Sequence, residues 1–282
     1  MAIPIINAWE KFFDNPHEGL GSSYERIVLN DLLLDTAAKY DAQSVLESPS
    51  FGFTGISGIN LVALADAGLE VTLEDDNTHR LELIRNLWRT LDRSFTARHN
   101  PGFKRLDYPD QAFDLSFSFS ALWFVPDLNS FLRELSRVTS KAIFISVPNR
   151  AGLGYKMQLK DYSAAKYPDL RLDNIDPPSI IRLLKALGWK LAESGCFDCP
   201  PWPDIGMTKE ELLAKWLPQW LLPKKLARPK QDDGEAISIL SHYLGDDPGF
   251  DERMRAYQWL EKAAPEALKR VWAHHFRMVF ER

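Results

Sequence analysis

The sequence predicts an α/β fold built on a doubly wound, mostly parallel sheet. Apolar strand-like runs alternate with amphipathic helical runs from residue 44 to residue 193, and this alternation is typical of parallel sheets. The strand predicted over 141–147 is almost entirely apolar, as expected where helices cover both faces of a sheet. Residues 45–76 add a strand, a glycine-bearing turn, a helix and a second strand that ends in acids.

Hydrophobic periodicity places the individual elements. In the helix predicted over 78–91, for example, Leu81, Ile84, Leu87 and Trp88 share one face. Ser22 or Ser23 is expected to cap the first helix. The predicted helices are 22–40, 58–67, 78–91, 128–138 and 178–187, and the predicted strands are 44–47, 70–74, 103–106, 113–119, 141–147, 189–193 and 275–280.

Residues 194–270 break the alternation. They contain the segment PPWPD, tryptophan-rich helical stretches and Asp/Gly/Pro turns. We interpret 207–270 as a helical insertion, or lid, between the last two strands of one domain formed by 1–206 and 271–282. Within it, residues 216–230 join Trp and Leu to a basic run, which favours a lid packed on the sheet domain over a lip in contact with a membrane.

The composition excludes several classes of protein. The chain has 282 residues, 45% of them hydrophobic, and a net charge of −5, which argues against a nucleic-acid binder. No apolar run approaches the ~20 residues of a membrane span, and no secretory signal is visible. The two cysteines, Cys196 and Cys199, suit a cytoplasmic chain with reduced thiols. A zinc or dithiol site at these cysteines, completed by His274 and His275, is disfavoured, and no metal is expected.

The turn after the first strand carries the first functional signal. Gly52, Gly55 and Gly58 allow the backbone to approach a bound group closely. The second strand runs into Asp75 and Asp76. Amides at a helix N-terminus and a carboxylate after the next strand are the parts of a mononucleotide-binding βαβ unit, in which the carboxylate accepts ribose hydroxyls.

A longer segment resembles a known family. In FDLSFSFSALWFVPDLNSFLRELSRV, followed by KAIFISVPN, the residues in register with the family's pattern are Phe113, Asp114, Leu122, Pro126, Asp127, Leu132, Glu134, Arg137 and Val138. Over about residues 20–195 the chain resembles class I S-adenosylmethionine-dependent methyltransferases, of the branch that methylates small molecules and quinone precursors. The resemblance implies a Rossmann-like seven-stranded sheet whose last strand is antiparallel.

The chain departs from this family at three places. Pro49, Phe51 and Phe53 stand where the glycine motif has glycines, so the motif is degenerate. Trp123 and Phe124 replace a histidine, and the acid that contacts adenine has no counterpart near Phe103 and Lys104.

The resemblance nevertheless implies S-adenosylmethionine as the cofactor and methyl transfer to a small, largely apolar organic acceptor. The predicted cofactor-binding residues are Glu47, Gly52, Thr54, Gly55, Asp75, Asp76, Ser118 and Phe119. Because ligands of open α/β sheets bind outside the carboxyl ends of the strands, the predicted acceptor pocket comprises Tyr24, Trp123, Asn149, Tyr155 and Trp202. No catalytic base is assigned.

Two alternatives to methyl transfer stay open. A degenerate glycine motif is also typical of a non-catalytic relative that serves as a binding or scaffold module. An enzyme of dinucleotides or nucleotide sugars would use the same strand–turn–helix unit, but the full G-x-G-x-x-G pattern is absent. An oligomer formed through the aromatic insertion is compatible with either.

Overall fold

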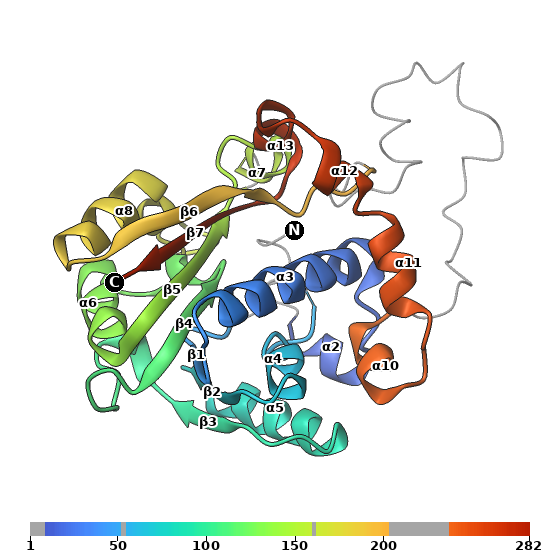
Figure 1. Cartoon of the computed structure of the whole chain (residues 1–282), viewed down its shortest axis with the longest axis horizontal. Coiled ribbons are helices and arrows are strands. Elements are labelled where there is room, and N and C mark those ends of the chain that lie inside the picture. Colours follow the sequence, from blue (N-terminus) through green and yellow to red (C-terminus); the bar gives the residue numbers. More distant parts are fainter. Residues whose placement is uncertain (1–8, 52–54, 160–161, 203–236) are drawn as a thin grey trace.

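The computed structural model describes residues 9–51, 55–159, 162–202 and 237–282. Their strands form one seven-stranded sheet in the order β3-β2-β1-β4-β5-β7-β6, shown in Figure 1. The strands are β1 (Ser44–Glu47), β2 (Glu70–Asp75), β3 (Thr96–His99), β4 (Phe113–Phe119), β5 (Thr139–Pro148), β6 (Lys190–Phe197) and β7 (His275–Glu281). β7 runs antiparallel to both β5 and β6, and the pairs among β1 to β5 are parallel. The predicted fold class, with its antiparallel last strand, is confirmed.

The helices follow the strands in alternation, as predicted. Before and between the first strands lie α2 (Lys11–Asp14), α3 (Gly19–Lys39), α4 (Val62–Asp66), α5 (Thr78–Thr90) and the short 3₁₀ helix η1 (Pro101–Phe103). The second half holds η2 (Leu122–Phe124), α6 (Leu128–Val138), α7 (Leu153–Gln158), η4 (Leu172–Ile175), α8 (Pro177–Ala186), α10 (Ile239–Leu244), α11 (Phe250–Ala256), α12 (Trp259–Ala263) and α13 (Glu266–Trp272).

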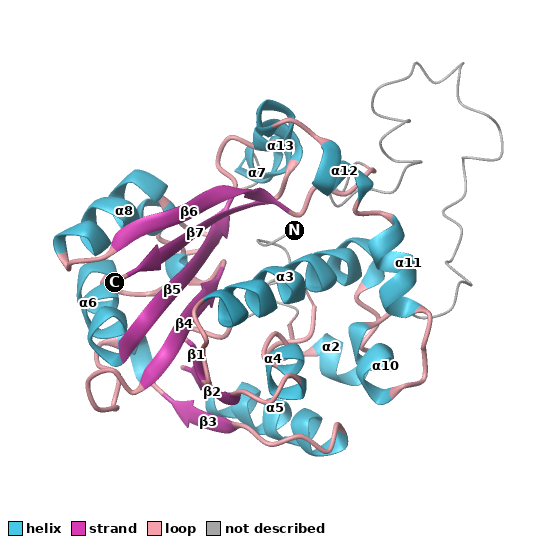
Figure 2. Ribbon diagram, in the orientation of Figure 1, coloured by secondary structure: helices cyan, strands magenta, loops and turns pink. Residues whose placement is uncertain are grey.

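Two hydrophobic cores lie on opposite faces of the sheet. One contains α3, α4 and α5 packed on alternate strand residues such as Val45 and Phe117. The other contains α6 and α8 packed on the intervening positions, such as Leu46 and Ile143. Figure 2 shows these helix layers on either side of the sheet. This double coverage explains why the strand predicted over 141–147 is apolar on both faces.

The helices after residue 237 pack on α3. Phe250 and Met254 of α11 are buried in the same core as α3. Asp31 of α3 accepts a hydrogen bond from Arg255 at 2.7 Å and another from Gln258 at 3.1 Å. The described part of the predicted insertion is therefore helical and shares a core with the sheet. Residues 203–236, including the basic stretch 216–230, lie outside the described residues.

Three local predictions were wrong. The third strand is Thr96–His99 instead of 103–106. It was not predicted because it is a largely exposed edge strand without an apolar pattern. Phe103 adopts a positive φ of 52°, which is not the backbone conformation of a regular strand. α3 begins at Gly19, so Ser22 and Ser23 lie within the helix instead of capping it. α4 starts four residues later than predicted, at Val62, because the preceding residues form turns.

Candidate functional site

A cavity of about 400 Å³ opens at the carboxyl ends of the first strands. Its walls come from segments that follow β1, β2, β3 and β4 and from residues 166–171. The lining residues that matter here are Phe51, Asp76, Asn77, Arg80, Phe103 and Phe124. This volume lies within the range of about 300–1,000 Å³ typical of small-molecule sites, and the position is where open α/β sheets bind ligands.

Asp75, at the end of β2, is engaged inside the protein. Its side chain is fully buried. The Arg80 guanidinium donates Nη2–H to Oδ1 at 2.6 Å and Nε–H to Oδ2 at 2.8 Å, a bidentate pair. Ser50 Oγ also donates to Oδ2, at 3.0 Å. Asp76, not Asp75, is the acid that lines the cavity; burial first, and then the neighbouring Asp75 charge, raise the pKa of Asp76.

Phe51 forms a wall of the cavity. The Arg80 guanidinium carbon lies 4.1 Å from the Phe51 ring centroid, and the Phe124 ring meets Phe51 edge-on at 5.0 Å. The bulky residue that replaces a motif glycine is thus held between a cation and an aromatic edge. The neighbouring predicted residues Gly52 and Thr54, together with Phe53, lie outside the described residues.

The carboxylate of Glu18, the residue just before α3, accepts a hydrogen bond from a backbone amide at the end of the glycine loop. Its Oε1 accepts a hydrogen bond from the N–H of Ile56 at 2.8 Å and another from Arg26 at 3.3 Å. Gly55 has a φ of +98°, and an added Cβ would collide with the Glu18 carboxylate. Glycine is therefore favoured at 55 by its φ, and a larger residue there would also displace the Glu18 carboxylate. Sequence reasoning did not find Glu18.

Glu47, at the end of β1, is a buried acid. Its Oε1 accepts from Asn60 at 2.7 Å, while Oε2 has no hydrogen-bond partner among the described residues. Burial raises the pKa of Glu47 to about 8, against the lowering effect of Asn60. Ser118 of β4 is also fully buried, and its hydroxyl likewise lacks a partner in the described part of the chain.

The structure brings together two of the five predicted acceptor-pocket residues. Tyr24 and Trp202 contact each other edge-to-face at 5.6 Å, and Tyr257 lies against Trp202 at 4.9 Å. Trp123 and Tyr155 are buried in the core on the α6 and α8 face. Asn149 donates to the carbonyls of Arg270 and Ala273, so it fastens the end of β5 to the segment before β7.

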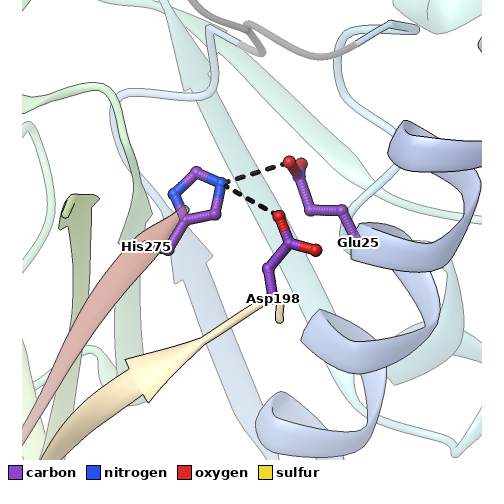
Figure 3. A group of neighbouring side chains, drawn as sticks. All are labelled: Glu25, Asp198 and His275. Carbon is purple, nitrogen blue, oxygen red and sulfur yellow. Dashed lines mark hydrogen bonds and ion pairs between the residues drawn. The ribbon is translucent and has the colours of Figure 1, made fainter. Parts of the chain in front are cut away.

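Figure 3 shows a buried cluster of Glu25, Asp198 and His275. The cluster lies where β6 ends and β7 begins. His275 begins β7 and is paired in register with Pro148 and Phe197, the last residues of β5 and β6. His275 Nε2 is 3.1 Å from Glu25 Oε2 and 3.9 Å from Asp198 Oδ2. Burial raises the pKa of Asp198, opposed chiefly by His274. Sequence reasoning missed Glu25 and Asp198, which lie 173 positions apart.

Comparison with known proteins identifies the class of domain. Residues 53–145 match the family model described as "Methyltransferase domain". This segment contains the strands, helices and turns from the glycine loop to β5. This part of the chain is thus similar to methyltransferase domains. No curated protein matches the sequence.

Solved structures show the same fold. The plantazolicin methyltransferase BamL, solved in complex with a triazolic desmethylPZN analogue and SAH, has a TM-score of 0.55 and 12% identity, over 98% of this chain and 90% of that one. The [4+2]-cyclase SpnF has a TM-score of 0.51 and 15% identity, over 90% and 79%. At these identities the likeness concerns the fold, on which function depends on the site.

The residues of the cavity suit an adenosyl group. Phe51, Phe103 and Phe124 offer aromatic surface for a base, and Asp76 offers a carboxylate for hydroxyls.

Among described residues, no helix has the length and apolar character needed to cross a membrane.

Proposed function

We propose that this chain transfers the methyl group of S-adenosylmethionine to a small, largely apolar organic acceptor. The cofactor supplies an electrophilic methyl group on a sulfonium. The observation that carries the proposal is the cavity at the carboxyl ends of β1 to β4, which is lined in part by the segment that matches the methyltransferase domain. Positioning supplies much of the acceleration in such a displacement, so the residues that fix the two reactants matter most.

The proposal uses the cofactor-binding residues predicted from the sequence, and the contacts in the structure refine the role of each residue. Asp76 accepts ribose hydroxyls from within the cavity, while Asp75 acts through Arg80, whose guanidinium it holds against Phe51. Buried Glu47 and Ser118 present atoms without partners in the described structure and are assigned to the methionine end. We place Phe119 beside the cofactor, and the acceptor beside Tyr24 and Trp202, whose rings contact each other.

S-adenosylhomocysteine binding tests this proposal. It is expected to raise the Tm in a concentration-dependent way, because a ligand that binds only the folded state stabilises it by mass action. Asp76→Asn should weaken binding about tenfold or more, since a hydrogen bond to a charged group contributes about 1.5–3 kcal/mol. Asp107→Asn is the matched control, because that side chain is 95% exposed. Isothermal titration of the three proteins measures the effect, and equal affinities would remove Asp76 from the site.

One observation favours a second candidate, a non-catalytic binding module. The Asp75 carboxylate that the family resemblance assigns to ribose is already paired with Arg80, and Glu18 already holds the amide of Ile56. A module of this kind would show no Tm shift with S-adenosylhomocysteine, even at millimolar concentration, and no methyl transfer. The same thermal experiment therefore decides between the two candidates.

A further inference from the structure

We propose that Glu25, Asp198 and His275 form a binding site for one divalent transition-metal ion, best matched by Zn²⁺. The three side chains come from α3, from the residue after β6 and from the first residue of β7. One ligand atom from each lies within 4.8 Å of the others. The inference does not depend on the proposed methyl transfer.

The donor atoms have the spacing of a metal site. Zn²⁺ binds imidazole nitrogen and carboxylate oxygen at about 2.0–2.2 Å in tetrahedral geometry, which places neighbouring donors about 3.3–3.5 Å apart. The distances from His275 Nε2 to Glu25 Oε2 and to Asp198 Oδ2, 3.1 and 3.9 Å, lie on either side of that value. Small side-chain movements would therefore complete the coordination.

The surrounding hydrogen bonds orient these donors as in known metal sites. A metal-binding histidine commonly donates its other ring N–H to an oxygen, and a metal-binding carboxylate is itself hydrogen-bonded. Here His275 Nδ1 lies 2.9 Å from Ser120 Oγ, and His274 Nδ1 lies 2.7 Å from Asp198 Oδ2. When Nδ1–H of His275 donates to Ser120, its Nε2 lone pair faces two carboxylates, and a cation is needed to hold the three together.

An unpartnered atom also points to a missing ligand. Asp198 is only 1% exposed, yet its Oδ1 has no hydrogen-bond partner in the described part of the chain. In Figure 3 this oxygen points away from His275, whereas Oδ2 faces the imidazole ring. A buried carboxylate with one unpartnered oxygen is unfavourable, and a cation bound at Oδ2 would compensate its charge. Mixed oxygen and imidazole ligands favour a transition metal over Mg²⁺.

Metal titration of the full chain tests the site. After dialysis against EDTA, the protein is titrated with Zn²⁺ and, separately, with Mg²⁺, and bound metal is measured by mass spectrometry after desalting. We expect one equivalent of Zn²⁺ and a Tm increase of about 5–10 °C at a hundredfold excess over Kd. Absence of Zn²⁺ binding, or equal affinity for Mg²⁺, would overturn the proposal and leave the cluster as a structural hydrogen bond between His275 and Glu25.

Variants assign the ligands. Asp198→Asn and His275→Asn are each expected to lower Zn²⁺ affinity at least a hundredfold and to abolish the visible spectrum of bound Co²⁺. Glu193→Gln on β6 and His79→Asn on α5 are matched surface controls that should keep both. Loss of binding in Cys199→Ser but not in Asp198→Asn would refute this ligand set. Should a ligand variant fail to fold, the wild-type titration still decides the proposal.

Discussion

At the scale of single residues, the buried acids at the ends of β1 and β2 are held in different ways. Asp75 accepts two hydrogen bonds from the Arg80 guanidinium. Glu47 has only an amide donor and keeps a bare oxygen among described residues. The two acids end neighbouring strands of the sheet, but only Asp75 has a cation in contact.

Glu47 should make the protein less stable as pH rises. Its folded-state pKa of about 8 lies above the ordinary value of 4.5, so between these values the folded state binds more protons than the unfolded state. Stability therefore falls from about pH 4.5 to pH 8 and levels off above, by a few kcal/mol at about 1.4 kcal/mol per pKa unit. Urea denaturation at pH 5, 6.5 and 8 measures the slope.

Glu47→Gln is expected to remove most of that decline. The control is Glu134→Gln, since hydrogen bonding by Arg137 lowers the pKa of Glu134. A lowered acid stabilises the fold above its unfolded pKa and loses that contribution as pH falls, so this variant should lose stability mainly at neutral pH. An unchanged slope in Glu47→Gln would show that Glu47 is ionised or solvated in the folded protein.

At the scale of elements, α6 explains why the family pattern spans 113–138. Arg137 donates to the carbonyls of Leu106 and Tyr108, and Glu134 accepts the N–H of Leu106. The Glu and Arg of the pattern thus fasten the β3–β4 connection to α6. They are structural positions that hold this connection in place, which is a role that spacing alone does not reveal.

The N-cap of α6 can be tested directly. Asp127 Oδ1 accepts from the N–H of Ser130 at 3.1 Å and Oδ2 from its hydroxyl at 2.6 Å. Asp127→Ala should reduce the free energy of unfolding by about 0.5–2 kcal/mol. Asp110→Ala, which removes only an exposed ion pair with Arg137, should change it by less than about 1 kcal/mol. Equal losses in urea denaturation would contradict the capping role.

Helices and strands with a clear hydrophobic periodicity could be predicted from the sequence, and the edge strand β3 could not. β1, β4 and α6 begin and end at the predicted residues, because each has an unbroken apolar pattern and clear turn signals. β3 was missed because one edge strand needs no buried face. The site was predicted as segments at the ends of strands, and its residues stay a prediction. The Glu25–His275 pair joins residues 250 positions apart, and sequence spacing cannot show such a contact.

At the scale of the whole molecule, the segment 237–257 and the sheet share one core. Phe250 is fully buried against α3, and Tyr243 accepts a hydrogen bond from Asn30 at 2.8 Å. Units that share a core are expected to unfold together. This arrangement predicts a single cooperative transition for the sheet and the described part of the insertion.

Calorimetry of the intact chain checks this expectation. Phe250→Ala should lower the free energy of unfolding by about 3–5 kcal/mol, because it leaves a cavity in that core, and should keep a single transition at lower Tm. Leu268→Ala, at a side chain 44% exposed, should have an effect within about 0.5 kcal/mol. Two separate transitions in the wild type, with Phe250→Ala shifting only one, would contradict a shared core.

The position of β7 has a consequence during synthesis. β6 ends at Phe197 and β7 begins at His275, and the described ladder of β6 is with β7 alone. While the intervening residues are being translated, β5 and β6 each present an open edge, and unpaired edges are templates for association with other chains. Nascent chains stalled before residue 275 should therefore be the species most prone to aggregate and most dependent on chaperones.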